Sequence, residues 1–587
     1  IVFYESGNKG VSEEHMAIMK AIRDRFDPHG GRAIGSREML DSKIAEYGGE
    51  MLYVDKSSGK PMWAMEYSRD EGARAYQDEY SPPFHKDEPA YNRNQDSLAI
   101  EDVKRWYEYY RTRPGTGRRV SAGGVNIIFS DSNTHYRGDN NYRRSGEVDA
   151  VRLPKEGYFA NKVMWSDWVD SVTPSTHLVG HWNYGPGTVK DVTAVSNGKE
   201  LELFLNGRSL GKGGRSDGFL FTWKNVAYAP GVLVARARHA GGATSEAKVE
   251  TAGVPVMLKL TPRTSPRGFV MDGADIAFVD VEVVDGEGRR VPVANPKVHF
   301  DLAGPAEWRG GIAQGDSSGR IRRTEPVPGH DPRYPGRARD EDNFILSKDL
   351  PVENGISRVL LRAGRQAGMV RLRASAPGLK EAILEIPGLA AERVSGGLSS
   401  DFPERHQQGL LTRGPTPQGQ GYGPARSTFI PSSVITPSNR SSAAASFDGN
   451  ELTRWTSDGT PANAWIEYRF DTRGTFSSID LKLLGWRSRS YPLRVAIDGR
   501  TVWEGETERQ LGYARIGFPA TTGKVVRITQ VGPTVDRDAF GKIVELSQTR
   551  QGGDTGADEV PTGWHLGIFE VDFNGPPAGD RPIAADR

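Results

Sequence analysis

The first 165 residues alternate short apolar runs with helical patterns, whereas the pattern after residue 175 is almost entirely that of short strands. A strand that is buried on both faces gives a continuous apolar run. Such runs, separated by helical patterns or long loops, predict a parallel sheet built from βα units. The runs occupy residues 1–5, 32–36, 49–54, 62–66 and 121–131.

Two helices are predicted between these runs. Ser12 is a candidate N-cap for the first, in which Ile18, Ile22 and Phe26 recur at a spacing of four and form an apolar face. The second runs from about Asp96 to Arg111, and the sequence RPGTG ends it. Its expected packing stripe consists of Leu98, Ile100, Val103, Trp106, Tyr107 and Tyr110.

The remainder of the chain predicts all-β domains. Asn-Gly pairs at 197–198 and 206–207 indicate tight hairpins, and alternating strands surround an Asp-Gly turn further on. A stretch rich in Gly, Pro, Ser and Gln indicates a linker. We expect part of a (β/α)₈ barrel at 1–170, β-sandwiches at 171–253 and 254–390, a linker at 391–428, a third β domain at 429–575 and a tail at 576–587.

Composition limits the possible partners and chemistry. The 587 residues require several domains, and a formal charge of +1 gives no electrostatic footprint for nucleic acid or an anionic membrane. The absence of Cys excludes disulfides and cysteine nucleophiles, and no apolar run is long enough to span a bilayer. Neither a phosphate-binding loop nor a G-x-S-x-G elbow is present. Because the chain opens within a strand, we expect a preceding segment of the same protein to complete the barrel.

Two glutamates end predicted barrel strands. Glu5 closes the first apolar run and Glu66 the fourth. In a (β/α)₈ barrel the chemistry lies where the strands end, and a pair of carboxylates there is what glycoside hydrolysis needs. The alternative interpretation is that both are ordinary solvated glutamates.

Longer stretches resemble a known enzyme family. The segments PMWAMEYS, GGVNIIFSDSNTHYRGD and RRSGEVDAVRLPKEGYFANKVMW resemble the second half of the catalytic barrel of glycoside hydrolase family 2, the β-galactosidase and β-glucuronidase family. The segment HLVGHWNYGPGTVKDVTAVSNGKELELFLNGRSLGKG is similar to the Ig-like domain that follows this barrel in many bacterial members. Together the resemblance covers roughly residues 1–390.

The resemblance implies a retaining mechanism in which Glu66 is the nucleophile. The acid/base belongs at the end of the fourth barrel strand, where most members carry an Asn-Glu pair. This chain instead has Glu5 three residues before Asn8, and Lys9 stands where the usual Glu would fall. We take Glu5 as the acid/base and Asn8 as a contact of the sugar 2-hydroxyl, with Glu13 and Glu14 as weaker alternatives for the acid/base.

Further substrate contacts are expected near the strand ends. Trp63, Tyr67 and His135 could stack on a sugar or donate hydrogen bonds to it, and Arg37 and Asp131 could bind hydroxyl groups. The alternatives are that the aromatic residues pack the barrel and that Arg37, Asp55 and Asp131 pair with one another.

The third β domain resembles the discoidin-like, or coagulation-factor type C, modules that bind sugars in many carbohydrate-active enzymes. The matching segments are AASFDGNELTRWTSDGTPANAWIEYRF and LGIFEVDF. The resemblance implies a structural Ca²⁺ held by Asp448, Thr453 and Glu570, whose oxygen donors suit a hard cation. A simple Asx turn at Asp448 and Asn450 is the alternative. The segment GWRSRSYP either faces a ligand or covers the core.

These inferences predict a secreted or periplasmic bacterial exo-glycosidase that hydrolyses terminal β-linked sugars of an oligosaccharide or polysaccharide, most simply β-galactosides, without a cofactor for catalysis. A β-glucuronidase is the alternative enzyme, with Lys9 or Arg37 meeting the sugar carboxylate. A non-catalytic carbohydrate-binding protein is the alternative from another class.

Overall fold

A computed structural model describes most of the chain, which divides into two compact units. Ile1–Glu71, Lys104–Ile128 and Tyr422–Arg587 form the first unit, and Gly72–Val103 with Phe129–Gly421 form the second. The predicted barrel piece therefore contributes to both units. The described residues are 3–7, 10–27, 32–51, 58–67, 78, 80–81, 93–112, 120–126, 129–131, 146–169, 173–312, 346–391, 428–509, 512–537 and 559–576.

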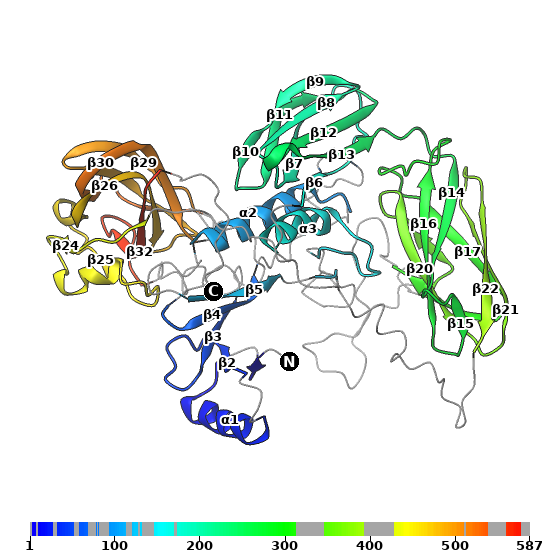
Figure 1. Cartoon of the computed structure of the whole chain (residues 1–587), viewed down its shortest axis with the longest axis horizontal. Coiled ribbons are helices and arrows are strands. Elements are labelled where there is room, and N and C mark those ends of the chain that lie inside the picture. The colour runs from blue at the N-terminus through cyan, green and yellow to red at the C-terminus, as the bar shows by residue number, and fades with distance from the viewer. Residues whose placement is uncertain are drawn as a thin grey trace. The chain divides into compact units, whose positions relative to one another are not determined.

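The first unit contains a five-stranded sheet in the order β1-β2-β3-β4-β5, drawn in blue in Figure 1. All neighbouring strands are parallel, which confirms the predicted βα pattern. The third strand lies slightly earlier than predicted. The strands are β1 (Tyr4–Glu5), β2 (Ile34–Arg37), β3 (Tyr47–Met51), β4 (Pro61–Tyr67) and β5 (Val120–Asn126).

Helix α1 (Glu13–Phe26) begins where the sequence predicts. The Ser12 hydroxyl accepts a hydrogen bond from the His15 N–H at 3.2 Å, as an N-cap should. The predicted apolar face is wrong: Ile18, Ile22 and Phe26 are 51, 53 and 72% exposed. Met16 is fully buried instead, in a cluster with Ile34, Met39 and Ala45.

Two further helices follow in the chain. Helix α2 (Asp96–Thr112) matches the prediction, with Leu98, Val103 and Trp106 buried. Helix α3 (Glu156–Val169) packs against β6 and β7 of the first sandwich. No helix in the described part of the chain is long and apolar enough to cross a membrane.

The first β-sandwich lies in the second unit and consists of two four-stranded sheets, β10-β11-β7-β6 and β13-β12-β8-β9. Asn206 and Gly207 have φ of 51° and 80°, which is the left-handed pair that a two-residue hairpin requires. The elements are β6 (Thr176–Leu178), β7 (Val189–Ser196), β8 (Glu200–Leu205), β9 (Arg208–Lys212), β10 (Gly214–Ser216), β11 (Leu220–Ala227), β12 (Val232–Arg238), η3 (Ala240–Gly242) and β13 (Thr244–Glu250).

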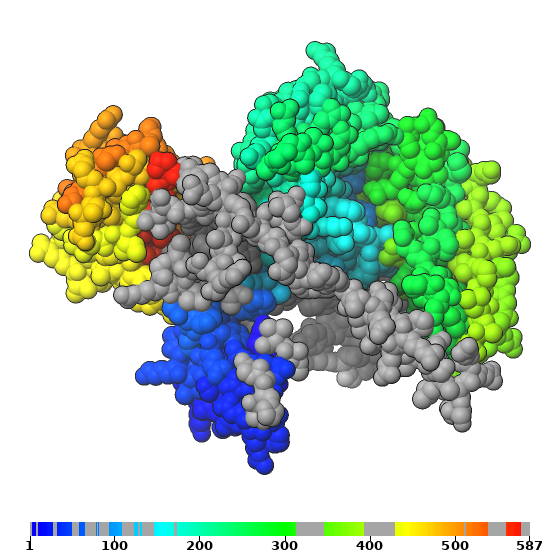
Figure 2. Space-filling model, viewed as in Figure 1, coloured from blue at the N-terminus to red at the C-terminus, as the bar shows by residue number. Residues whose placement is uncertain are grey.

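The second sandwich belongs to the same unit and pairs the sheets β14-β16-β20-β18 and β15-β22-β21-β17-β19. Figure 2 shows the first sandwich in teal and the second in green to yellow-green. One buried aliphatic cluster fills the second sandwich. Its strands are β14 (Met257–Arg263), β15 (Phe269–Met271), β16 (Ile276–Val284), β17 (Lys297–Ala303), β18 (Ala306–Gly311), β19 (Asp349–Pro351), β20 (Ile356–Ala363), β21 (Gly368–Ser375) and β22 (Ala382–Ala390).

The third β domain has its own aromatic and aliphatic core, which includes Trp455 and Tyr468. Its main sheet has the order β23-β32-β26-β30-β28-β29, with β24 and β25 on the side and a separate pair β27-β31. The elements are β23 (Thr428–Phe429), β24 (Ser433–Ile435), η5 (Arg440–Ser446), β25 (Trp455–Thr456), η6 (Pro461–Asn463), β26 (Trp465–Leu483), β27 (Arg489–Ser490), β28 (Pro492–Ile497), β29 (Arg500–Glu506), β30 (Ala514–Gln530), β31 (Val535–Asp536) and β32 (Gly567–Asn574).

Several predicted features lie outside the described residues. They are the linker at 392–427, the tail from 577 onward and the greater part of the polar loop before residue 559.

Candidate active site

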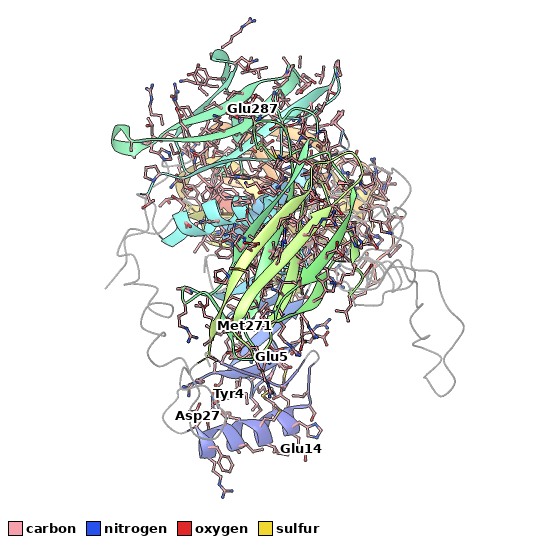
Figure 3. The ribbon with its side chains drawn as sticks, turned by 90° about the vertical axis from the view of Figure 1, so that its right-hand side faces the viewer. Tyr4, Glu5, Glu14, Asp27, Met271 and Glu287 are labelled. Carbon is pink, nitrogen blue, oxygen red and sulfur yellow. The ribbon has the colours of Figure 1, made fainter. Side chains whose placement is uncertain are left out.

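Glu5 is the last residue of β1, where its backbone pairs with Gly35 of β2. Its side chain is exposed, and the strand that carries it lies beside helix α1, with Glu14 and Asp27 at opposite ends of that helix (Figure 3). Burial and the charge of Glu5 together raise the pKa of the neighbouring Tyr47 hydroxyl. Glu5 thus lies within electrostatic range of a buried ring on β3.

Three aromatic rings line the face of the sheet next to Glu5. The Phe3 ring makes edge contacts with Tyr47 at 5.1 Å and with Trp63 at 5.3 Å between centroids. In a flat sheet, side chains stand perpendicular and strands lie about 4.8 Å apart, so β1 and β4 would hold their rings about 14 Å apart. The sheet is therefore curved, and the rings lie on its concave face. Because alternate residues share a face, Glu5 lies on the same side as Phe3.

Gly35 permits this packing. A Cβ at Gly35 would lie 2.3 Å from the Tyr47 carbonyl oxygen and 2.7 Å from its ring. The Tyr47 ring therefore covers β2 at the position that pairs with Glu5, and its hydroxyl donates to the Tyr4 carbonyl at 3.0 Å. The pattern of apolar residues gave no sign of this cluster, although a glycine inside a strand is a recognised signal of close approach.

Glu66 is the next-to-last residue of β4, and its backbone pairs with Met51. The pairing register of β4 shifts near Glu66 on both sides. The shift against β3 falls between Glu50 and Met51, and the shift against β5 falls between Ala64 and Tyr67. Such irregularities re-aim side chains next to active sites. The Glu66 side chain lies outside the described residues, so the expected separation of about 5 Å between the two carboxyl groups stays a prediction.

The structure describes some of the predicted sugar contacts, and the others lie outside the described residues. Trp63 is half-buried against Phe3, and Arg37 ends β2 with its guanidinium 3.2 Å from the Glu38 carboxylate. Glu13 and Glu14 occupy the first turn of α1, and Glu13 accepts backbone hydrogen bonds from 43–44. Outside the described residues lie Asn8, Lys9, His135 and the side chain of Tyr67.

Asp131 belongs to the second unit and has a buried partner that the sequence did not reveal. The Lys155 ammonium donates to both of its carboxylate oxygens, at 2.8 and 3.0 Å, and the Gly146 N–H donates at 2.8 Å. Lys155 also donates to Gln95 at 2.7 Å. The pair is almost completely buried, which gives Asp131 a structural role. Its contact with substrate stays a prediction.

The predicted cation ligands of the third β domain converge on one loop. Asp448 accepts hydrogen bonds from the Asn450 N–H and the Thr453 hydroxyl, both at 2.9 Å, which is the Asx turn of the alternative interpretation. Glu570 accepts from the Gly449 N–H at 2.9 Å. Two carboxylates, one hydroxyl and the loop carbonyls thus offer oxygen donors of the kind that Ca²⁺ prefers. Within the described residues, no group of three or more His, Asp or Glu side chains could hold a metal ion.

The GWRSRSYP segment covers the core and does not face outward. Trp486, Arg487, Arg489 and Tyr491 are all at most 3% exposed. Arg489 donates to the Asp536 carboxylate at 2.8 and 3.1 Å, and the Tyr491 hydroxyl donates to the Leu484 carbonyl at 2.8 Å. The ligand-facing interpretation of this segment is therefore wrong.

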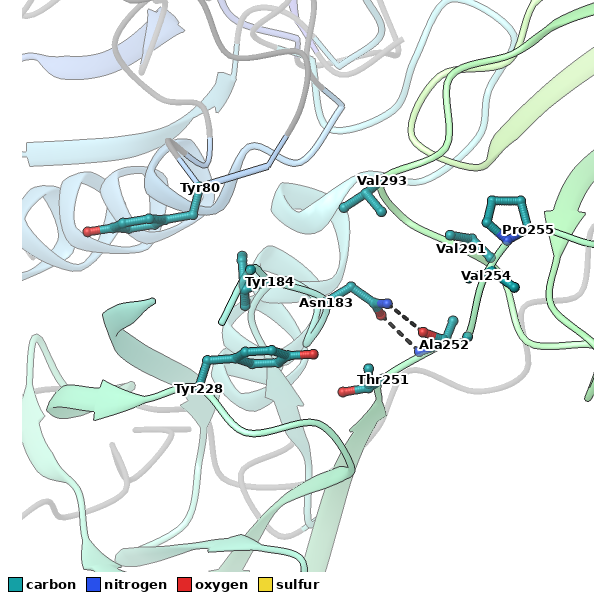
Figure 4. Close-up of a pocket in the computed structure, with 12 residues that line it drawn as sticks. Tyr80, Asn183, Tyr184, Tyr228, Thr251, Ala252, Val254, Pro255, Val291 and Val293 are labelled. Atoms are coloured by element: carbon teal, nitrogen blue, oxygen red, sulfur yellow. Dashed lines mark hydrogen bonds between the residues drawn. The ribbon is translucent and has the colours of Figure 1, made fainter. Parts of the chain in front are cut away.

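A cavity of about 530 Å³ lies in the second unit (Figure 4). The rings of Tyr80, Tyr184 and Tyr228 line it, and Asn183 is bonded to both backbone groups of Ala252, at 2.8 and 3.0 Å. The Lys190 ammonium donates a hydrogen bond to the Tyr184 hydroxyl at 2.6 Å. The amide of Asn183 and the hydroxyl of Tyr184 are therefore used in holding the fold.

Known proteins resemble this chain along much of its length. A family profile described as "Domain of unknown function (DUF4982)" matches residues 187–245, and one described as "Glycoside hydrolase family 2 C-terminal domain 5" matches residues 258–323. A β-glucuronidase of Formosa agariphila is 33% identical over 432 residues, 71% of this chain and 40% of that protein. A β-galactosidase of Bacteroides ovatus is 31% identical over 243 residues, 41% of this chain and 25% of that protein.

A solved structure agrees with these matches. A β-glucuronidase from glycoside hydrolase family 2 superposes with a TM-score of 0.59 at 25% identity, covering 90% of this chain and 57% of that structure. The half-barrel sheet and the two sandwiches match the multidomain fold of glycoside hydrolase family 2. The chain belongs to glycoside hydrolase family 2 and spans less than half the length of the curated relatives that it matches.

Proposed function

We propose that the intact protein is a retaining β-glycosidase that removes terminal β-linked sugars. The observation that carries the proposal is the position of Glu5 and Glu66. Both lie at the carboxyl ends of strands in one curved parallel sheet, and Glu5 lies beside a ring-lined concave face. Active sites of barrel enzymes are built at these strand ends.

In this proposal Glu66 attacks the anomeric carbon and forms a glycosyl ester while the glycosidic bond breaks. Glu5 gives its proton to the leaving oxygen, and in the second step it takes a proton from the water that attacks the same carbon and releases Glu66. Trp63 stacks on the sugar ring, and Asn8 holds its 2-hydroxyl. The same proposal includes Tyr67, Asp131 and His135 as further sugar contacts.

Two sugars remain candidates, and a β-glucuronide is favoured over a β-galactoside. The β-glucuronidase relative matches 71% of this chain, whereas the β-galactosidase relative matches 41%. Arg37 supports this choice, because it places a guanidinium at the end of β2 where a sugar carboxylate can meet it. The sequence-based preference for galactosides has no such support.

Paired substitutions test the roles of the two glutamates. In the intact protein, Glu66→Ala should abolish hydrolysis of aryl and natural glycosides alike. Glu5→Ala should abolish hydrolysis of natural glycosides but spare the first step with aryl glycosides, whose leaving groups need no proton. The same substitution at Glu13 or Glu14 tests the alternatives for the acid/base. Unchanged rates in both Glu5→Ala and Glu66→Ala would leave a non-catalytic carbohydrate-binding protein as the function.

The sugar is tested by comparing kcat/KM for aryl β-glucuronide and aryl β-galactoside. Arg37→Gln should lower kcat/KM for the glucuronide by about tenfold or more, since a hydrogen bond between charged groups contributes about 1.5–3 kcal/mol. The galactoside, which has no carboxylate, is the control. An equal loss for both sugars would assign Arg37 a structural role.

The same proposal extends to the other domains. The two sandwiches would be Ig-like, and residues 429–575 would be a discoidin-like sugar-binding module with Ca²⁺ on the loop of Asp448, Thr453 and Glu570. Calcium should raise the unfolding temperature of the intact protein, and Asp448→Asn should remove that increase. A protein that acts on polymeric glycans would be exported to the periplasm or the medium.

A further inference from the structure

A second cavity in the second unit has an unusual charge. It measures about 610 Å³ and lies between the loop at 152–154, helix α3 and one sheet of the second sandwich. Two acidic residues line it, Asp280 and Glu282. Against them stand six basic residues: Arg93, Arg152, Lys259, Arg263, Arg290 and Arg358. Since the whole chain carries a formal charge of only +1, this excess is local.

The acidic residues of the cavity are already engaged. Asp280 accepts hydrogen bonds from Arg358 at 2.6 Å and from Arg263 at 2.5 Å. Glu282 lies 3.1 Å from the Lys259 ammonium. Two carboxylates therefore pair with three cations, Arg358, Arg263 and Lys259, so the cavity keeps an excess of positive charge.

Arg93 is neutralised from outside the cavity. It is buried, forms an ion pair with Asp149 and donates to the Pro154 carbonyl at 2.6 Å. Its charge is therefore balanced, and the cations that remain are Arg290 and Arg152.

Among the residues that the structure describes, the Arg290 side chain forms no ion pair or hydrogen bond, and only longer-range charge interactions act on it. Burial and the neighbouring charge of Arg93 lower the pKa of Arg290 to about 10, and the carboxylates of Glu156 and Glu282 only partly offset this effect. A half-buried cation without a counter-ion is costly, and a bound anion would remove that cost.

Arg152 is held at the same cavity by a strained loop. Its φ is 67°, a left-handed conformation that is unfavourable for a side chain of this size. The Asp149 carboxylate fixes the loop, because it accepts hydrogen bonds from the Val151 and Leu153 N–H groups at 3.0 and 2.8 Å. Strain of this kind persists where the surroundings impose it, and it is concentrated at binding sites.

One aromatic ring completes the cavity. Phe159 of α3 is 40% exposed and stacks on His177 at 5.2 Å between centroids, with 27° between the planes. The Arg152 guanidinium donates a hydrogen bond to the Ser130 hydroxyl, but neither Arg152 nor Arg290 is paired with a carboxylate among the described residues. An exposed ring beside such cations suits a ligand that combines a flat apolar face with a negative charge. A sugar ring that carries an acidic group has both properties.

We propose that this cavity binds the sulfate or carboxylate group of an acidic glycan through Arg290 and Arg152, with the sugar ring against Phe159. The choice of a glycan among anions rests on the proposed function, whereas the choice of an anion rests on the charges of the cavity. The protein would hold an acidic polysaccharide through this site in addition to cleaving it.

Binding of polymers that differ only in charge tests the proposal in the intact protein. Dextran sulfate is compared with dextran to test recognition of sulfate groups. Polygalacturonate is compared with its methyl ester to test recognition of carboxylate groups. The charged member of at least one pair should bind at least tenfold more tightly than its neutral partner. Arg290→Gln and Arg152→Gln should each weaken that binding by about tenfold, which corresponds to the loss of about 1.4 kcal/mol.

Arg208→Gln is the matched control, because it removes the same charge from an exposed site on β9 and should change binding less than twofold. Arg152 is exposed, so its replacement also covers the case in which Arg290→Gln fails to fold. Equal binding of charged and neutral polymers, no binding at all, or unchanged binding in both variants would overturn the proposal. Tighter binding of a single-stranded oligonucleotide than of either acidic glycan would also overturn it.

Hydrolysis of an aryl glycoside is measured in the same variants. Loss of the proposed catalytic function would remove hydrolysis from the wild type while charge-dependent binding through Arg290 persists. Failure of the anion site would leave hydrolysis intact and remove that binding, so the two failures are distinguishable.

Discussion

At the scale of single residues, Glu46 joins three parts of the half-barrel. It accepts hydrogen bonds from Arg23 and Lys20 of α1, each at 2.8 Å, and from the Ile34 N–H of β2 at 3.0 Å. The bond with Arg23 is the main cause that lowers the pKa of Glu46 to about 2. Glu46 therefore stabilises the docking of α1 on the sheet.

The first prediction concerns the pH dependence of this contact. Because the pKa is lowered from 4.5 in the ordinary state to about 2 in the fold, the stabilisation is complete above pH 4.5 and is lost as the pH falls toward 2. Glu46→Gln should lower the free energy of unfolding at pH 7 by about 1–3 kcal/mol. In urea titrations the difference from wild type should shrink between pH 4.5 and 2. Exposed Glu14→Gln, the control, should change stability by less than about 0.5 kcal/mol at every pH.

The second prediction concerns Gly35, which pairs with Glu5. A Cβ there would clash with the Tyr47 carbonyl and ring, so Gly35→Ala should destabilise the fold by about 1–3 kcal/mol and reduce kcat/KM of the intact protein. Gly517→Ala in β30 is the control, because a Cβ at Gly517 would meet no atom within 4 Å. If Gly35→Ala matched Gly517→Ala in both stability and rate, the ring cluster would not shape the site.

At the scale of elements, α1 shows that a sequence pattern predicts a helix better than it predicts which face of the helix is buried. The N-cap of Ser12 and the apolar spacing define the helix because both act within a few residues. The pattern does not say which neighbour covers which face, and the sheet contacts the side that carries Met16. The strands were predictable for the same local reason, as were the hairpin at Asn206 and the strand-end position of Glu5.

Other features depend on contacts between distant elements and left no local signal. The ring cluster of Phe3, Tyr47 and Trp63 depends on the curvature of the sheet. The pair of Asp131 and Lys155 joins the residue after the Ser130–Val148 bridge to the loop before α3, and many lysines were equally plausible partners. The strand-end position of Glu5 was therefore predictable, and the packing around it was not.

The third prediction compares the two faces of α1. Met16 is fully buried, so Met16→Ala should lower the free energy of unfolding by about 2–5 kcal/mol. Ile22 is 53% exposed, and Ile22→Ala should cost less than about 1 kcal/mol because alanine also favours the helix. Chemical denaturation of both variants measures these losses in the free energy of unfolding. Equal losses would mean that the face of Ile22 is covered in the intact protein.

At the scale of the whole molecule, the chain distributes its stability over separate cores. The third β domain and the second sandwich each have their own buried cluster, and they belong to different compact units. Cores that share few contacts unfold as separate cooperative units. The proposed anion site lies in the second unit and Glu5 in the first, so we expect substitutions to remove the proposed binding and the proposed hydrolysis independently.

The fourth prediction follows from this division. Thermal unfolding of the chain should show at least two calorimetric transitions. Trp455 is fully buried and donates to the Ser438 carbonyl at 3.2 Å, so Trp455→Ala should lower one transition by roughly 10 °C, since the loss is about 3–5 kcal/mol. Phe300→Ala, from the core of the second sandwich, should lower the other by a similar amount. If both variants moved one common transition, the two cores would be coupled, and loss of one would carry the candidate site with it.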